Sequence, residues 1–241
     1  MPMTTPPYPQ NHARLGGLLY LVIIAAGIFG ELFVRGSMVA SGDAAATAAH
    51  IAATPGLWRT GIAVDLLMHV CDVFVMWVIY LLLRPTSARL ALLVLLLNLI
   101  QTAVLVANKL LLLVPLFLSE GHPAYLAGLD APQLQALGYL AIRIHEYGFG
   151  VGLVFFGAVC LVEGYLIRRS GYLPRLIGTA MQLAGACYVV NSTLLLLMPH
   201  LQGQLFPFLM LPCLVAELSF ALWLLVRGVD VQAFHKALAR A

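Results

Sequence analysis

The chain has 241 residues, of which 62% are hydrophobic and 10% are charged, and its mean hydropathy is +0.96. Soluble domains carry about 25% charged residues, so this composition excludes a soluble globular protein and indicates that lipid is the solvent. The net charge of +3 comes from residues in short connections between apolar runs, so we attribute it to membrane topology and expect no nucleic-acid partner. The four cysteines lie in apolar runs without a CxxC pair, and we interpret them as small buried residues.

Six apolar runs follow one another along the chain, and each reaches the roughly 20 residues that a membrane-spanning helix needs. They cover residues 15–34, 57–83, 90–118, 137–167, 173–198 and 206–226. The Ala-rich residues 43–53 predict a short helix on the outer surface, and Asp130-Ala131-Pro132 predicts the start of the fourth helix. We therefore predict an all-α integral membrane protein with six transmembrane helices. Residues 1–14 form a cytoplasmic tail, 15–228 the transmembrane domain, and 229–241 a short basic amphipathic tail.

The lysines and arginines predict the orientation of these helices. Nine of the thirteen fall on one side of the predicted membrane, and they are Arg14, Arg84, Arg89, Arg168, Arg169, Arg175, Arg227, Lys236 and Arg240. Cytoplasmic loops are enriched in such residues, so we expect both termini in the cytoplasm.

The second predicted span contains three polar residues, Asp65, His69 and Asp72. Each ionised residue at mid-membrane costs roughly 2.5–3.5 kcal/mol on the insertion scale. Their spacing of four and three residues places them on one helical face. Such a face must be turned toward other helices or a water-filled cavity, and it is the best indication of a functional site.

Counting residues from the predicted cytoplasmic boundary places polar groups of five spans at one level. We predict that they line an outward-facing pocket formed by Asp65, His69, Asp72, His145, Glu146, Asn191, Glu31 and Arg143. The alternative is that Arg35, Lys109 and Arg143 reach along the helix to water, because long side chains near helix ends can do so. Amides deeper in the membrane are expected to hydrogen-bond helices together, and the Gly148–Gly152 spacing predicts a close helix contact.

We weigh three functions for these polar residues, and a haem site beside them. The leading hypothesis is a protein without catalytic activity that binds a small or lipid-like ligand in the pocket. A metal-dependent enzyme is the second, with Asp65, His69, Asp72 and His145 as zinc ligands, although no HExxH or HxxxH motif occurs. A bis-histidine haem between His69 and His145 fits less well because the two rings differ in depth. A small-solute carrier is the third hypothesis, and the oligomeric state stays open.

Several segments carry a family resemblance, among them GGLLYLVIIAAGIFGELFVRG, DAAATAAHIAA, IAVDLLMHVCDVFVMWVIYLLLRP and HEYGFGVGLVFFGAVCLVEGYLIRRSGYLPRLIG. The chain resembles a bacterial family of polytopic membrane proteins known as a domain of unknown function, DUF4386, from about Leu15 to Val229. The resemblance implies a bacterial inner-membrane protein of about six helices, with acidic residues at the positions of Asp65 and Asp72. It implies no reaction, so no catalytic residue is carried over.

Overall fold

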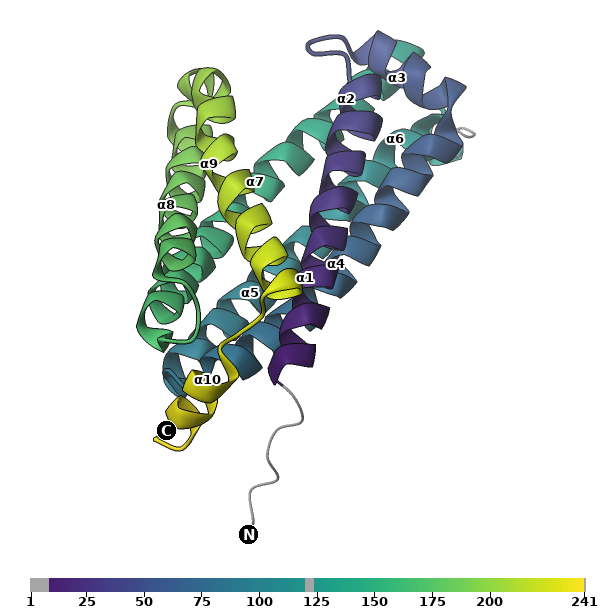
Figure 1. The fold of residues 1–241 in the computed structure, drawn as a ribbon. Coiled ribbons are helices and arrows are strands. Elements are labelled where there is room, and N and C mark those ends of the chain that lie inside the picture. Colours follow the sequence, from purple (N-terminus) through teal and green to yellow (C-terminus); the bar gives the residue numbers. More distant parts are fainter. Residues whose placement is uncertain (1–8, 120–123, 241) are drawn as a thin grey trace.

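The computed structural model describes residues 9–119 and 124–240, and within these ranges it contains helices and loops but no strand (Figure 1). Six helical runs in this part of the chain are long and apolar enough to cross a membrane, which confirms the predicted fold class. They are α1 (Pro9–Ile28) continued by η1 (Phe29–Arg35) and α2 (Gly36–Met38), α4 (Pro55–Leu83), α5 (Ala88–Asn108) continued by η2 (Lys109–Leu113) and α6 (Val114–Ser119), α7 (Ala131–Ser170), α8 (Arg175–Leu197) and α9 (Pro199–Val226). Shorter helices are α3 (Ala44–Ala53), η3 (Ala124–Leu126) and α10 (Val231–Leu238).

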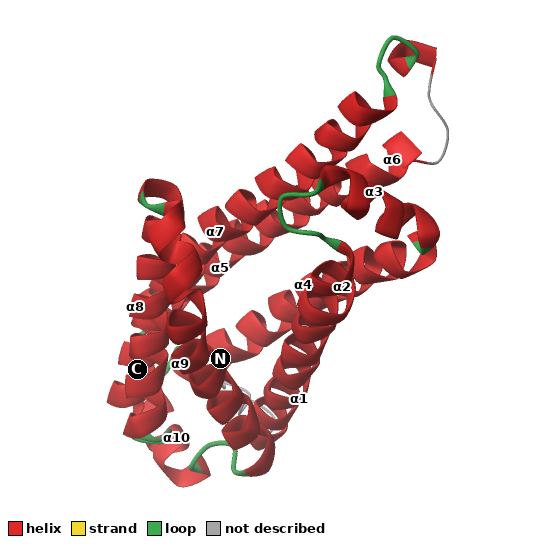
Figure 2. Cartoon of the chain, turned by 90° about the horizontal axis from the view of Figure 1, so that it is seen from above, coloured by secondary structure: helices red, strands yellow, loops and turns green. Residues whose placement is uncertain are grey.

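The spans form a ring in which neighbours in sequence are neighbours in space (Figure 2). Helix α4 packs between α1 and α5, α7 between α5 and α8, and α9 closes the ring by packing against both α8 and α1. We call the end that carries Pro9, Arg84, Ser170 and Arg227 the basal end, and the opposite end, which carries α3, the distal end. Helix α1 begins and α10 lies at the basal end, so both ends of the described chain are on the same side (Figure 1).

Side-chain caps begin several helices where the sequence predicts them. Asp43 accepts a hydrogen bond from the Ala46 N–H at 2.8 Å and begins α3. Asp130 begins α7 by accepting from the Gln133 N–H at 2.9 Å, while the Gln133 side chain accepts from the Asp130 N–H. Both caps satisfy N–H groups that have no partner inside the helix. The predicted starts of the short helix between the first two spans and of the fourth span are therefore confirmed.

The first and third spans depart from regular α-helix at the same level. In η1 the Gly36 N–H donates to the Glu31 carbonyl, five residues back, which makes this turn a π-helix. In η2 the chain tightens to a 3₁₀-helix because Pro115 has no N–H to donate to Leu111, and the Val114 N–H donates to that carbonyl instead. Neither irregularity is predicted by apolar run length, and both lie beside charged residues.

The last span is longer than predicted. Helix α9 begins at Pro199 and not near residue 206, and it continues through Pro207 and Pro212. Proline is accepted at the first helical position, so the turn after α8 leads directly into α9. As a result, α8 and α9 form a tight hairpin.

A buried tyrosine joins the connections at the basal end. The Tyr172 hydroxyl donates to the Leu82 carbonyl at 2.7 Å and lies 2.9 Å from the Thr86 hydroxyl. Phe234 of α10 packs edge-on against its ring, with 5.3 Å between centroids. Burial raises the pKa of Tyr172 to about 12, so it stays a neutral donor. The C-terminal tail therefore contains a helix, α10, whose Phe234 packs onto the protein.

Candidate functional site

An ion-pair network surrounds Asp65 at the distal end of the ring. The Asp65 side chain is 0% exposed, and its Oδ2 atom accepts from Arg35 Nη1 at 2.6 Å and from Lys109 Nζ at 2.8 Å. Arg35 also donates through Nε to Glu31 at 2.9 Å. Three spans thus contribute two acids and two bases whose charges cancel. Breaking such a buried arrangement is costly because it leaves an uncompensated charge out of water.

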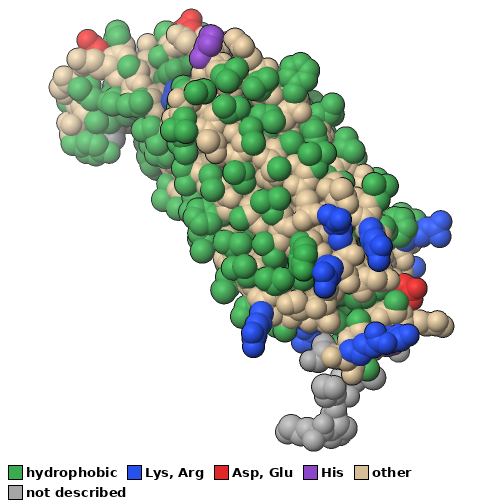
Figure 3. Space-filling model, turned by 90° about the vertical axis from the view of Figure 1, so that its left-hand side faces the viewer, with side chains coloured by type: hydrophobic (Ala, Val, Ile, Leu, Met, Phe, Trp, Pro, Cys, Tyr) green, Lys and Arg blue, Asp and Glu red, His purple; other side chains and the backbone are tan. Residues whose placement is uncertain are grey.

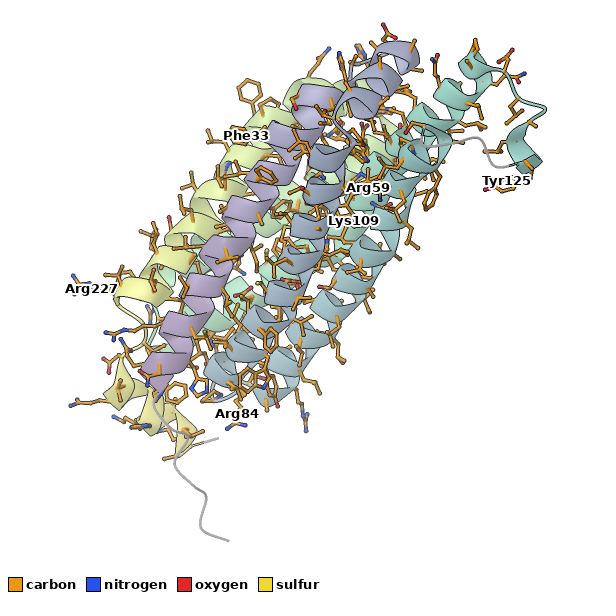
Figure 4. The ribbon with its side chains drawn as sticks, turned by 90° about the vertical axis from the view of Figure 1, so that its right-hand side faces the viewer. Phe33, Arg59, Arg84, Lys109, Tyr125 and Arg227 are labelled. Carbon is orange, nitrogen blue, oxygen red and sulfur yellow. The ribbon has the colours of Figure 1, made fainter. Side chains whose placement is uncertain are left out.

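Lys109 connects this network to the fourth span. Its side chain is 4% exposed and lies between the helices, far from Arg84 and Arg227 at the basal end (Figure 4). Its Nζ atom is 3.3 Å from His145 Nε2 on α7. An ammonium group has only donors, so Nε2 is the acceptor and the imidazole hydrogen lies on Nδ1. The interpretation that Lys109 reaches water is therefore wrong, because apolar residues 110–118 extend the span beyond it.

Close approach of α5 and α7 holds His145 in place. Asn108 Nδ2 donates to the His145 carbonyl at 2.8 Å. Gly148 leaves room for the Asn108 amide, where a Cβ atom would collide with it, and Gly152 likewise faces Leu105. The glycine spacing that predicts a close helix contact is confirmed, and its partner is α5.

Asp65, His69 and Asp72 are all buried, as their shared helical face predicts, but they meet different partners. The His69 Nε2 atom has no hydrogen-bond partner in the described part of the chain. Asp72 lies nearer the basal end and accepts from Asn98 Nδ2 at 2.9 Å and from Thr102 Oγ1 at 2.5 Å. One stripe on α4 therefore serves two separate polar groups.

The remaining predicted residues are bonded to other partners. Arg143 and Glu146 form an ion pair with each other, and their side chains are 46% and 40% exposed. Asn191 of α8 is buried and accepts from Gln202 Nε2 of α9 at 2.9 Å. A cavity of about 250 Å³ lies elsewhere, between α3, α6 and α7, and none of the eight predicted residues lines it.

The candidate zinc ligands do not fit a metal ion. In the described ranges no three His, Cys, Asp or Glu side chains are grouped so that they could hold one. The Lys109 ammonium bonds to both Asp65 and His145, so a cation of the protein already occupies the place that zinc would take. We therefore derive no metal chemistry from Asp65, His69, Asp72 and His145.

Comparison with known proteins identifies the family. Residues 15–228 match the family described as "Domain of unknown function (DUF4386)". The chain belongs to the DUF4386 family. An "Uncharacterized protein" of Archaeoglobus fulgidus is 25% identical over 162 residues, which cover 67% of this chain and 80% of that protein. No solved structure matches the chain.

In this DUF4386 protein a second polar group lies nearer the basal end, and its member Glu163 is the residue that sequence reasoning undervalued. Glu163 is 0% exposed, although counting along the chain places it near the membrane boundary. Glu217 accepts hydrogen bonds from Tyr20 at 3.1 Å and from Tyr188. The signal that could have found this group is the presence of a carboxyl in two different spans, each flanked by apolar residues on both sides.

Proposed function

We propose that this DUF4386 protein lies in the bacterial cytoplasmic membrane with both termini in the cytoplasm. In Figure 3 the lysine and arginine side chains gather at the basal end. Short loops rich in such residues stay in the cytoplasm, so the basal end faces inward and the distal end outward. The family resemblance supports the bacterial membrane.

We further propose that the outward half binds a lipid-like ligand, an amphiphile whose head carries both signs of charge. Accessible charged side chains support the binding of such a head group. The Glu31 side chain is 68% exposed, and those of Arg143 and Glu146 are 46% and 40% exposed. Glu31 and Glu146 are close enough to interact electrostatically, although they come from the first and fourth spans. A zwitterionic head could pair with both the carboxylates and the guanidinium.

The observation that carries the proposal is an apolar helix, α9, whose distal half is uncovered and whose hairpin partner α8 contacts α7 one turn from Glu146. Helix α9 buries no residue between Pro199 and Pro212, and Phe208 and Leu211 are among its exposed side chains. Its bonds to α1 lie in the basal half, where Glu217 accepts from Tyr20, and the hairpin leans away from α1 toward the distal end (Figure 1). Leu195 of the same hairpin packs where Gly150 has no side chain, one turn from Glu146. An acyl chain along α9 would thus lie near the charged groups.

A lipid-retention experiment tests this proposal. The full chain is purified in detergent, incubated with phosphatidylethanolamine, and examined by native mass spectrometry. We expect the wild type to retain the lipid, Arg143→Gln and Glu146→Gln to lose it, and Arg84→Gln at the basal end to behave as wild type. The proposal fails if the wild type retains no lipid, or if the Arg143 and Glu146 variants retain as much as the wild type.

A further inference from the structure

Three carboxyl groups occupy the interior of the ring on the basal side of His69. They belong to Asp72 of α4, Glu163 of α7 and Glu217 of α9, and we call them the interior carboxyls. The residues Asp72 and Glu163 are buried, and Glu217 is partly buried. Glu163 interacts electrostatically with Glu217 and Asp72, and Glu217 interacts with Asp72. The four salt bridges between lysine or arginine and carboxylates that we describe all lie elsewhere, at Asp65, Glu31 and Glu146.

Neutral groups surround two of the interior carboxyls. Asp72 accepts from the Asn98 amide and the Thr102 hydroxyl through the same oxygen, Oδ2. Glu217 accepts from the phenols of Tyr20 and Tyr188, one on each of its oxygens. These donors stabilise the carboxyls by hydrogen bonds but bring no compensating charge.

Glu163 has less support than the other two. Its side chain is completely buried, and neither carboxyl oxygen has a hydrogen-bond partner among the described residues. Two buried amide oxygens of α5 are in the same position, Asn98 Oδ1 and Gln101 Oε1. Asn98 donates to Asp72 through its Nδ2 atom, so its unsatisfied Oδ1 atom lies beside one of the interior carboxyls. Several buried oxygens in one region therefore lack donors.

The interior carboxyls lack both hydrogen-bond donors and a compensating positive charge, and a bound proton would supply both. A proton on a carboxyl neutralises it and creates an O–H group that can donate to a neighbouring oxygen. A metal cation would need several of these oxygens to converge, and no such grouping of His, Cys, Asp and Glu occurs in the described ranges. Carboxyls in the interior of membrane proteins often form proton relays.

We propose that the interior carboxyls form a proton-binding site at mid-membrane that is loaded from the distal side through His69. His69 stands three residues from Asp72 on the same face of α4, a rise of about 4.5 Å, and its Nε2 atom is unpartnered among the described residues. A proton taken up at Nε2 forms an N–H bond, which breaks when an O–H bond forms on Asp72. The same exchange then passes the proton to Glu217 and Glu163. This site is independent of the proposed lipid site.

Other titratable groups face the interior carboxyls from the surrounding helices. They are Tyr20 of α1, Cys160 of α7, Tyr188 of α8 and Cys213 of α9, while α5 contributes only the amides and hydroxyl of Asn98, Gln101 and Thr102. None of these groups carries a positive charge in any protonation state. A proton shared among the carboxyls is therefore the positive charge available inside this part of the ring. His69, through which the site is loaded, is itself faced by the Lys109 ammonium of η2 and by Asp65 of its own helix.

Infrared spectroscopy of the full chain in lipid vesicles tests the site. At neutral pH we expect the C=O stretch of a protonated carboxyl, which shifts in D₂O and is lost reversibly as the pH is raised. Glu163→Gln should remove or shift this band. Asp43→Asn is the matched control outside the ring, and it should leave the band unchanged because Asn caps a helix as well as Asp does.

Additional variants and ion controls define the results that would overturn the proposal. Absence of the band in the wild type would overturn the proposal, and so would a band unchanged in Glu163→Gln, Glu217→Gln and Asp72→Asn. If Glu163→Gln does not fold, judged by size-exclusion chromatography, the other two variants report on the same band. The vesicles are first measured in choline chloride. If the band is lost when NaCl replaces this salt, the site binds a metal cation, which would contradict the proposal. Hydrogen–deuterium exchange of the band should be slower in His69→Leu than in the exposed control His200→Leu, and equal rates would refute loading through His69.

Discussion

Asp65 is the residue on which the distal end of the ring depends. It bonds to cations from two other helices, so its charge offsets theirs inside a region with little water. The network also fixes the position of His145 through Lys109. Loss of Asp65 would leave the buried Lys109 and the partly buried Arg35 without their shared partner, whereas loss of Glu31 would leave Arg35 still bonded to Asp65.

The variant Asp65→Asn should therefore destabilise the protein by about 3–5 kcal/mol, the cost of breaking a buried ion pair. Glu31→Gln makes the same chemical change on the exposed side of Arg35 and should cost about 0–1 kcal/mol. Unfolding in mixed detergent micelles, followed by circular dichroism, measures both values. Equal losses in the two variants would show that Asp65 is not the centre of the network.

Individual residues also show how far sequence reasoning reaches. The four- and three-residue spacing of Asp65, His69 and Asp72 was enough to predict their burial, since a polar face cannot be turned to lipid. Their bonding partners could not be predicted, because these lie on other helices. The length of an apolar run does not show which face of a helix is turned toward its neighbour. Counting depth failed at Lys109, since its helical run continues to Ser119. It failed at Glu163 because packing against neighbouring helices, and not depth, buries this side chain.

Among the elements, the pairing of α7 with α8 depends on glycine. Gly157 faces Gly185, and Gly164 faces Gly178, so the two helices meet through backbone atoms at two points seven residues apart. Small residues allow this approach, and van der Waals packing is a main source of helix association in lipid. The repeated spacing is visible in the sequence, but its partner helix is not, because each span is apolar on most of its faces.

We predict that Gly185→Ala destabilises the protein by about 1–3 kcal/mol, the range for overpacking a tight interface. A Cβ atom at this position would lie 2.6 Å from the Gly157 carbonyl oxygen and 2.8 Å from the Leu161 nitrogen. Gly203→Ala in α9 is the matched control, since nothing lies within 4 Å of its Cβ and alanine favours helix by about 0.5–1 kcal/mol. Thermal unfolding should separate the two variants, and a Gly185→Ala protein as stable as Gly203→Ala would contradict this account of the interface.

At the scale of the whole molecule, the ring holds two polar groups, which are the ion-pair network at the distal end and the interior carboxyls nearer the basal end. Run length and composition were sufficient to predict six spans, because both follow from the thickness of the bilayer. The closure of α9 against α1 was not predictable, since it depends on side chains such as Tyr20 and Glu217 that meet across most of the sequence. The ring explains why polar residues from every span face inward, where other helices replace water.

The orientation of the ring decides from which side of the membrane lipids and protons reach the two proposed sites. We predict that the basal end is cytoplasmic. Single cysteines at Ala88 and Ser41, both exposed, mark the basal and distal ends in a background without the native cysteines. In intact cells an impermeant thiol reagent should label Ser41→Cys and spare Ala88→Cys until the membrane is broken, because arginine-rich loops are retained inside. Labelling of Ala88→Cys in intact cells would reverse the topology. The lipid site would then face the cytoplasm, and protons would enter through His69 from the cell interior.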